Sequence, residues 1–123
     1  MRRQGFTLIE LLVVMAIIAT LLSIVAPRYF RHLDRARETA LHQTLNVVRD
    51  AIDKYHADKD KYPATLDDLV EQHYLRQVPV DPISGSKEGW VLEPPPDDPA
   101  GGVWNIHSGD GGTDEAGVAY REY

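Results

Sequence analysis

The run from Phe6 to Ala26 consists mostly of Leu, Ile, Val and Ala and stops at Pro27. At about 1.5 Å of rise per residue, a helix over this run is about 32 Å long, which matches the hydrocarbon core of a bilayer. Its only full charge is Glu10, close to the N-terminal end. The run therefore predicts a transmembrane helix, and the rest of the chain has to be arranged around it.

Glu10 is out of place in such a helix unless it has a partner. A carboxylate inside a bilayer costs a few kcal/mol, and the run holds no Lys or Arg. Arg2 and Arg3 lie ahead of the helix, where they would pair poorly with Glu10. Cleavage between Gly5 and Phe6 would create an α-amino group, and the amine of a neighbouring copy is a better-placed partner than the chain's own. The sequence thus predicts self-assembly.

The N-terminal residues resemble the class III leader and first helix of type IV pilins and type II secretion pseudopilins. The matching residues are Met1-Arg2-Arg3-Gln4-Gly5, then Phe6-Thr7-Leu8-Ile9-Glu10, and Pro27 at the end of the run. The resemblance implies that a membrane prepilin peptidase cleaves after Gly5 and methylates the amine of Phe6. It also implies that Phe6, Glu10 and Pro27 take part in subunit assembly, with Glu10 used in docking. The alternative is an ordinary signal anchor in which Glu10 is incidental.

Length and charge limit what can follow this helix. With 123 residues in all, only one modest globular domain fits, which excludes a large enzyme core, and we expect no catalytic activity. The net charge of −6 would become −8 after loss of Arg2 and Arg3, and an acidic chain is poorly suited to binding nucleic acid. The chain has no cysteine, so it has neither a disulfide framework nor thiol chemistry.

The arginines ahead of the apolar run predict a cytoplasmic N-terminus, with everything after Pro27 outside the membrane. Together with this topology, the resemblance implies a cleaved leader (residues 1–5), a transmembrane and filament-core helix (6–27) and a globular domain (28–123) that is periplasmic if the cell has two membranes. The expected location is the bacterial inner membrane, with a single pass, and then a periplasmic filament.

Pro27 is expected to kink the helix rather than end it, because apolar residues continue beyond it at three- and four-residue steps. We expect one helix from about Phe6 to about Ala57. Its apolar stripe comprises Leu33, Ala36, Ala40, Leu41, Leu45, Val48, Ala51, Ile52 and Tyr55. The other face, with the spaced pairs Arg49–Asp53 and Asp50–Lys54, predicts a solvated or subunit-facing surface and carries Arg31, Arg35, Glu38, Arg49, Asp50, Asp53 and Lys54.

The remaining residues predict a small α+β domain, in which the long helix packs on a C-terminal antiparallel sheet as in pilins. Thr65 and Asp68 have the spacing of a capping box, so a short helix is expected from about Leu66 to about His73. Leu66, Leu69 and Val70 should point inward. Strands are predicted at residues 90–92 and 102–106, with Trp104 and Ile106 on one face, and an edge strand at 118–120. The proline-rich residues 93–101 between the first two are a loop.

Two further segments resemble the G-type, or major, pseudopilins: the Tyr62-Pro63 step, and Asp81-Pro82 followed by Gly85. An acidic, glycine-rich turn near the C-terminus also resembles the calcium loop of these proteins, although it is shorter. Its candidate calcium ligands are Ser108, Asp110, Asp114 and Glu115, since calcium takes several hard oxygen ligands. The alternative is a turn that binds nothing.

The resemblance implies a structural subunit of a type II secretion pseudopilus, a helical filament of identical copies that drives protein export. The implied partners are the prepilin peptidase, an inner-membrane assembly platform and its ATPase, minor pseudopilins and an outer-membrane secretin channel. Two alternatives stay open. One is a type IV pilin for adhesion, motility or DNA uptake, and the other is a membrane-anchored calcium-binding protein that never polymerises.

Overall fold

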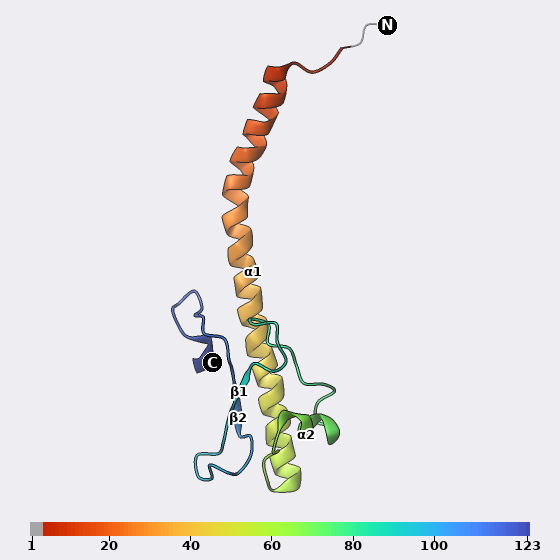
Figure 1. Cartoon of the computed structure of the whole chain (residues 1–123), viewed down its shortest axis with the longest axis vertical. Helices are drawn as coiled ribbons and strands as arrows, with labels where there is room; N and C mark the ends of the chain where they lie inside the picture. Colours follow the sequence, from red (N-terminus) through yellow and green to blue (C-terminus); the bar gives the residue numbers. More distant parts are fainter. Residues whose placement is uncertain (1–3) are drawn as a thin grey trace. The chain divides into compact units, whose positions relative to one another are not determined.

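The computed structural model describes residues 4–123. Their elements follow the order α1, α2, β1, β2 and a C-terminal 3-10 helix, η1 (Figure 1). The chain divides after Arg35 into two compact units, which are described separately below. The predictions for the leader that concern Met1, Arg2 and Arg3 lie outside the described residues.

Helix α1 spans Leu8–Lys59, so it begins and ends two residues later than predicted. Pro27 lies inside it, which confirms that the helix continues past this proline. Two hydroxyl groups of the apolar run are satisfied within the helix, because Thr20 donates to the carbonyl of Ala16 and Ser23 to that of Ala19, both at 2.8 Å. Such hydrogen bonds let Ser and Thr sit in an apolar environment without an unmet donor.

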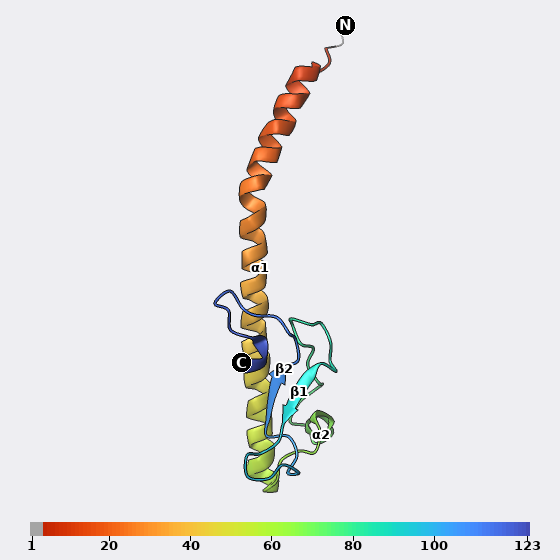
Figure 2. The same cartoon turned by 60° about the vertical axis from the view of Figure 1, so that its left-hand side comes forward.

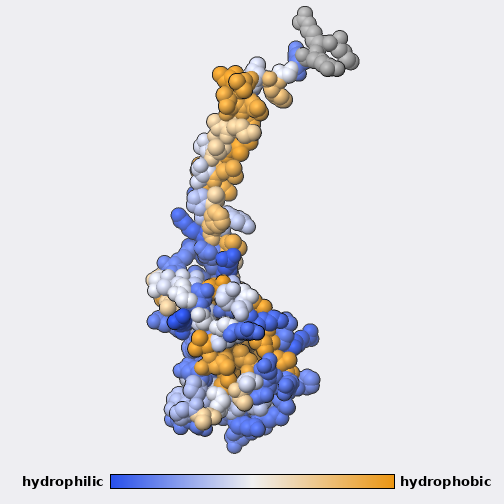
Figure 3. All heavy atoms as spheres, in the orientation of Figure 1, coloured by the Kyte–Doolittle hydropathy of each residue, from blue (hydrophilic) through white to orange (hydrophobic). Residues whose placement is uncertain are grey.

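The N-terminal part of α1 exposes its apolar side chains. Its most hydrophobic 18-residue window has no buried residue, and by length and composition the helix can cross a membrane. Figure 3 shows hydrophobic side chains, in orange, along much of this part of the helix. Burial of apolar area stabilises by about 25 cal/mol per Å², so a surface like this one calls for a lipid or protein environment.

The second unit is built on the C-terminal part of α1. The predicted apolar stripe is buried from Leu41 onward, whereas Leu33 and Ala40 are half-buried and Ala36 is exposed. The buried stripe residues are Leu41, Leu45, Val48, Ala51, Ile52 and Tyr55, and they pack with Leu66, Leu69, Trp90, Val103, Ile106 and Tyr120. The core therefore joins the helix to all of the later elements.

Helix α2 spans Leu66–Glu71 and lies beside α1. The Asp68 carboxylate accepts hydrogen bonds from the backbone of Ala64 (2.9 Å) and Thr65 (3.3 Å), as expected for the acidic member of a capping box. The helix ends before the predicted His73, because His73 adopts a left-handed conformation with φ 66°. Leu69 is buried as predicted, whereas Val70 is only half-buried.

Strands β1, Trp90–Glu93, and β2, Asn105–Ser108, form an antiparallel pair with Trp90 opposite Ser108 (Figure 2). The second strand begins three residues later than predicted, since Gly102 has φ 95° and the backbone of Val103 bonds to Pro63 instead. The predicted facing was wrong in part: Val103 is buried together with Ile106, and Trp104 is half-buried.

The predicted edge strand at residues 118–120 was wrong. Ala119 makes only an isolated bridge with Thr113, and η1 follows at Tyr120–Glu122. The chain turns here because Gly117 has φ 83° and because the Asp114 side chain accepts the backbone N–H of Val118.

Candidate functional site

Gly5 and Phe6 lie ahead of α1 in an extended segment, and both are exposed. The Phe6 side chain is 91% exposed. A Cβ atom added to Gly5 would meet no atom within 4 Å. The peptide bond between these residues is therefore open to a peptidase, and nothing in the fold itself requires glycine at position 5.

Glu10 takes part in a capping box that the sequence analysis missed. Its Oε2 accepts the backbone N–H of Thr7 at 3.0 Å, and the Thr7 hydroxyl accepts the backbone N–H of Glu10 at 3.2 Å. The signal was present in the sequence, because Thr and Glu three residues apart at the start of a helix form this motif. The carboxylate is thereby held at the first turn of the helix, where the helix dipole also favours a negative charge.

The four candidate calcium ligands lie at the end of β2 and in the turn after it: Ser108 is the last residue of the strand, and Asp110, Asp114 and Glu115 follow it. The buried Ser108 hydroxyl donates to the buried Asp81 carboxylate at 2.5 Å. Asp110 Oδ1 accepts the backbone N–H of Gly112 at 2.8 Å. Glu115 is exposed. Within residues 4–123, no three His, Asp or Glu side chains form a group that could hold a metal ion.

Asp114 is the most engaged residue of this turn. Its Oδ1 accepts the backbone N–H groups of Ala116 (2.8 Å) and Val118 (2.9 Å), and its Oδ2 accepts the Tyr123 hydroxyl at 2.6 Å. The hydrogen bond from Tyr123, followed by those from the backbone, lowers the pKa of the Asp114 carboxyl. In this arrangement the carboxylate closes the turn, and calcium could use it as a ligand only if these hydrogen bonds rearranged.

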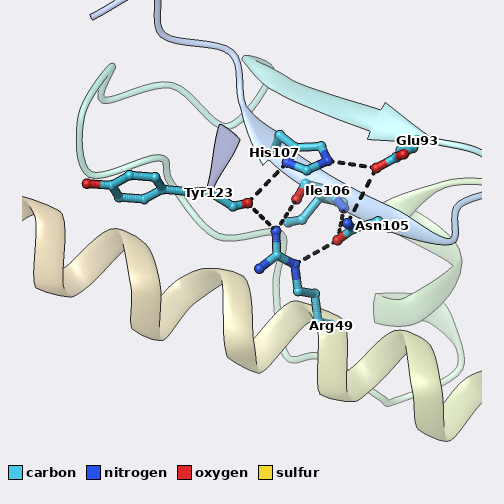
Figure 4. A network of polar contacts seen from close by, with 6 residues as sticks. All are labelled: Arg49, Glu93, Asn105, Ile106, His107 and Tyr123. Carbon is cyan, nitrogen blue, oxygen red and sulfur yellow. Dashed lines mark hydrogen bonds and ion pairs between the residues drawn. The ribbon is translucent and has the colours of Figure 1, made fainter. Parts of the chain in front are cut away.

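Arg49 belongs to a polar network, not to the solvated face that its spacing from Asp53 predicted (Figure 4). Its Nε donates to Asn105 Oδ1 at 2.7 Å, and its Nη2 donates to the main-chain oxygens of Ile106 (3.0 Å) and Tyr123 (2.6 Å). Burial lowers the pKa of the Arg49 guanidinium, and the Glu93 carboxylate opposes this shift. The predicted Asp50–Lys54 ion pair is present at 2.8 Å.

His107 completes this network from β2. Its Nδ1 lies 3.1 Å from the main-chain oxygen of Tyr123, and its Nε2 lies 2.7 Å from Glu93 Oε2. The ring therefore lies between the main chain of Tyr123 and the carboxylate of β1. The network ties the last residue described to α1 and to both strands.

Residues 1–26 match the family model described as a prokaryotic N-terminal methylation motif. The chain is 32% identical over 111 residues to the type II secretion system core protein G of Klebsiella michiganensis, covering 88% of this chain and 78% of that protein. The chain belongs to this pseudopilin family. The core protein G of Pseudomonas aeruginosa is 34% identical over 99 residues, covering 66% of this pseudopilin and 70% of the relative.

One relative is named for a different process. The competence protein ComGC of Halalkalibacterium halodurans is 30% identical over 76 residues, which cover 62% of this pseudopilin and 74% of the relative. No solved structure matches the pseudopilin significantly.

Proposed function

We propose that this pseudopilin is a structural, non-catalytic subunit of a type II secretion pseudopilus. A prepilin peptidase would cleave it between Gly5 and Phe6 and methylate the new amine of Phe6. The helix over residues 6–27 would then pack against the same helix of other copies to form the core of a helical filament. Growth of this filament would drive protein export.

The observation that carries this proposal is the exposure of the N-terminal part of α1. The apolar side chains from Leu8 to Val25 are all exposed, and they follow directly after the accessible Gly5–Phe6 bond. A lipid bilayer suits this surface in the single subunit, and the helices of neighbouring subunits suit it in a filament.

Glu10 would guide each subunit into the filament. In hydrocarbon an unpaired carboxylate and an unpaired ammonium are both costly, so each is stabilised when they meet. The hydrogen bond to Thr7 holds the Glu10 carboxylate at the start of the helix. The methylated amine of Phe6 in a neighbouring copy is the proposed partner, and Pro27 would mark the end of the packed helix.

The proposed location is the inner membrane, with the globular domain in the periplasm. Arginines stand on both sides of the apolar run, Arg2 and Arg3 before it and Arg28 and Arg31 after it, so their distribution alone does not decide the orientation. The proposed orientation is therefore that of the family. The proposed partners are likewise those of the family, namely an assembly platform with its ATPase, minor pseudopilins and a secretin channel.

A pilus or competence filament is the second candidate function, because the similarity to ComGC extends over 76 residues. Both filament functions require contact between copies. We expect single cysteines introduced along residues 6–27 to crosslink copies in membranes that hold the assembly machinery. Absence of crosslinks, with the chain inserted, would leave a membrane-anchored protein that does not polymerise. The genes next to this one, for a secretin or for a pilus, separate the two filament functions.

We also propose calcium as a ligand of the acidic turn, with Ser108, Asp110, Asp114 and Glu115 as the candidate residues. The support is their closeness in sequence, at the end of β2 and in the turn that follows, and the resemblance of that turn to the calcium loop of the family. The hydrogen bonds of Asp114 count against a preformed site. The free energy gained by binding calcium would therefore have to exceed the free energy lost with these hydrogen bonds.

A further inference from the structure

The first turns of α1 after Pro27 combine basic and aromatic residues. Residues 28–35 hold three arginines and one aspartate, and all four side chains are exposed. Arg28, Arg31 and Arg35 follow one another at steps of three and four, so they lie along one face of the helix. The stripe starts directly where the apolar run stops.

Two exposed aromatic rings lie at the same level. Tyr29 and Phe30 are each 62% exposed, and their rings contact each other edge to face with centroids 5.9 Å apart. Large exposed rings are unfavourable in water. Tyr and other amphipathic aromatics are typical of the boundary between hydrocarbon and water, where they sit among lipid headgroups.

Helix geometry places these residues at the depth of the headgroups. If Pro27 marks the hydrocarbon boundary, Arg28 lies about 1.5 Å and Arg31 about 6 Å beyond it along the axis. The headgroup layer on one side of a bilayer is roughly 5 to 7 Å thick. Arg37, at about 15 Å, lies outside this layer. The depth therefore distinguishes the first two arginines from the later ones.

We propose that Arg28 and Arg31 bind the phosphate groups of anionic phospholipid headgroups, with Tyr29 and Phe30 seated among the same headgroups. The guanidinium group suits this role because it makes paired, charge-assisted hydrogen bonds to phosphate. These contacts hold the subunit at a defined depth until it is extracted into a filament. The proposal rests on the membrane anchoring proposed above, but not on filament assembly or on the orientation of the chain.

The competing partner for the stripe is an acidic surface of a second copy. Asp97 and Asp98 are exposed in the loop after β1 and could meet arginines of a neighbour. Lipid is favoured because the stripe is continuous with the apolar run and carries the aromatic pair. An acidic protein surface would explain the arginines but not the two exposed rings beside them.

The test uses the full chain in nanodiscs of phosphatidylcholine with about a quarter phosphatidylglycerol, an anionic lipid. Native mass spectrometry measures the ratio of the two lipids that stay bound when the chain is released. The variants are Arg28→Gln/Arg31→Gln, and Arg28→Lys/Arg31→Lys, which keeps the charge. The matched control, Arg37→Gln/Lys54→Gln, also removes two positive charges, but at exposed positions farther from the apolar run.

We expect wild type to be enriched in phosphatidylglycerol, and the glutamine variant to lose this enrichment by roughly five-fold for each arginine. The lysine variant should keep most of the enrichment, and the control should match wild type. Equal enrichment in wild type and the glutamine variant would overturn the proposal. The proposal would also be overturned if the glutamine variant bound lipid as wild type does but its copies crosslinked less in the cysteine experiment described above. That result would assign the stripe to the contact with a second subunit. A chain that fails to enter nanodiscs would contradict the anchoring itself, so the two failures are distinguishable.

Discussion

The main-chain oxygen of Tyr123 accepts a 2.6 Å hydrogen bond from Nη2 of Arg49, a residue 74 positions earlier in the chain. The same guanidinium group also bonds to Asn105 and Ile106 of β2. One side chain of α1 therefore holds the second strand and the C-terminal residue in place. Because the described sheet has only two strands, no backbone hydrogen bonds from a further strand hold β2 in place.

Loss of this arginine should destabilise the domain. Hydrogen bonds to charged groups contribute about 1.5 to 3 kcal/mol, and their loss leaves carbonyl groups without a partner. We expect Arg49→Ala to lower the free energy of unfolding by about 2 to 3 kcal/mol, and the melting temperature by roughly 10 °C or more. The measurement is a thermal melt of the chain from Arg28 onward, which keeps the whole buried core.

Arg49→Lys should recover only part of this loss, because an ammonium group cannot reproduce the planar fork. Arg37→Ala, at an exposed position of the same helix, is the control and should stay within about 0.5 kcal/mol of wild type. If Arg49→Ala melts like Arg37→Ala, the network does not support the fold.

The contact between Asp114 and Tyr123 should make stability depend on pH. The hydrogen bond lowers the pKa of Asp114 below its ordinary value of 3.8, so this contribution is present above that pH and is lost as the pH falls. Burial, and then the bond to Asp114, raises the pKa of Tyr123 above its ordinary value of 10.0, so the contribution is also lost at higher pH.

We therefore expect Tyr123→Phe to lower the melting temperature most between pH 3.8 and pH 10.0, with a smaller difference from wild type on either side. Tyr29→Phe changes an exposed tyrosine and serves as the control. A difference between Tyr123→Phe and wild type that is the same at every pH would show that the hydroxyl acts through packing and not through the Asp114 carboxylate.

Calcium binding is tested by melting the same soluble chain in calcium and in a chelator. At a hundredfold excess over the Kd, a ligand of the folded state stabilises by about 2.7 kcal/mol, which moves the melting temperature of a small domain by several degrees. Asp110→Asn and Asp114→Asn should each remove this difference between calcium and chelator. Because Asp114→Asn also weakens the turn, only that difference is compared, not the absolute melting temperature.

Indifference of wild type to the chelator would leave the acidic residues as a plain turn. A calcium effect that survives Asp114→Asn would place the ion elsewhere, and the exposed Asp97 and Asp98 would be the next residues to change.

Cleavage should depend on the size of residue 5 for reasons outside the fold. Gly5 is exposed and a Cβ added there would meet no atom within 4 Å, so Gly5→Ala and Gly5→Leu should both fold and insert like wild type. We expect partial processing of Gly5→Ala and accumulation of the precursor for Gly5→Leu, measured as a mass shift of the membrane-bound chain. Gln4→Leu adds bulk at the neighbouring position and is the control. Complete processing of Gly5→Leu would contradict the assigned cleavage site.

The sequence predicted the parts of the fold that depend on local patterns. The apolar run and the stripe from Leu41 to Tyr55 have a helical period, and Trp90 to Leu92 form a strand as expected. Boundaries were less predictable because backbone conformation decided them. His73 ends α2 with a left-handed φ, and the backbone bond of Val103 to Pro63 delays β2.

The polar contacts were harder to predict, because most of them join distant residues. Arg49 and Asp53 have the spacing of a helical ion pair, but the pattern cannot show that main-chain oxygens more than fifty residues away compete for the guanidinium. Val118 to Tyr120 resembled a strand for a different, local reason: the pattern does not show that the Asp114 side chain, four residues before Val118, folds the chain back there. The Thr7–Glu10 capping box is the exception, since its spacing is visible in the sequence.

The central claim is that the chain polymerises through its processed N-terminus. The most direct test is mass spectrometry of sheared filaments from cells with the secretion machinery, for wild type and for Glu10→Leu. We predict that assembled wild-type chains begin at N-methylated Phe6. We also predict that Glu10→Leu inserts and is processed but yields no filaments, although it loses the capping bond to Thr7, worth about 1 kcal/mol. Filaments built of chains that still begin at Met1, or normal filaments of Glu10→Leu, would contradict the account.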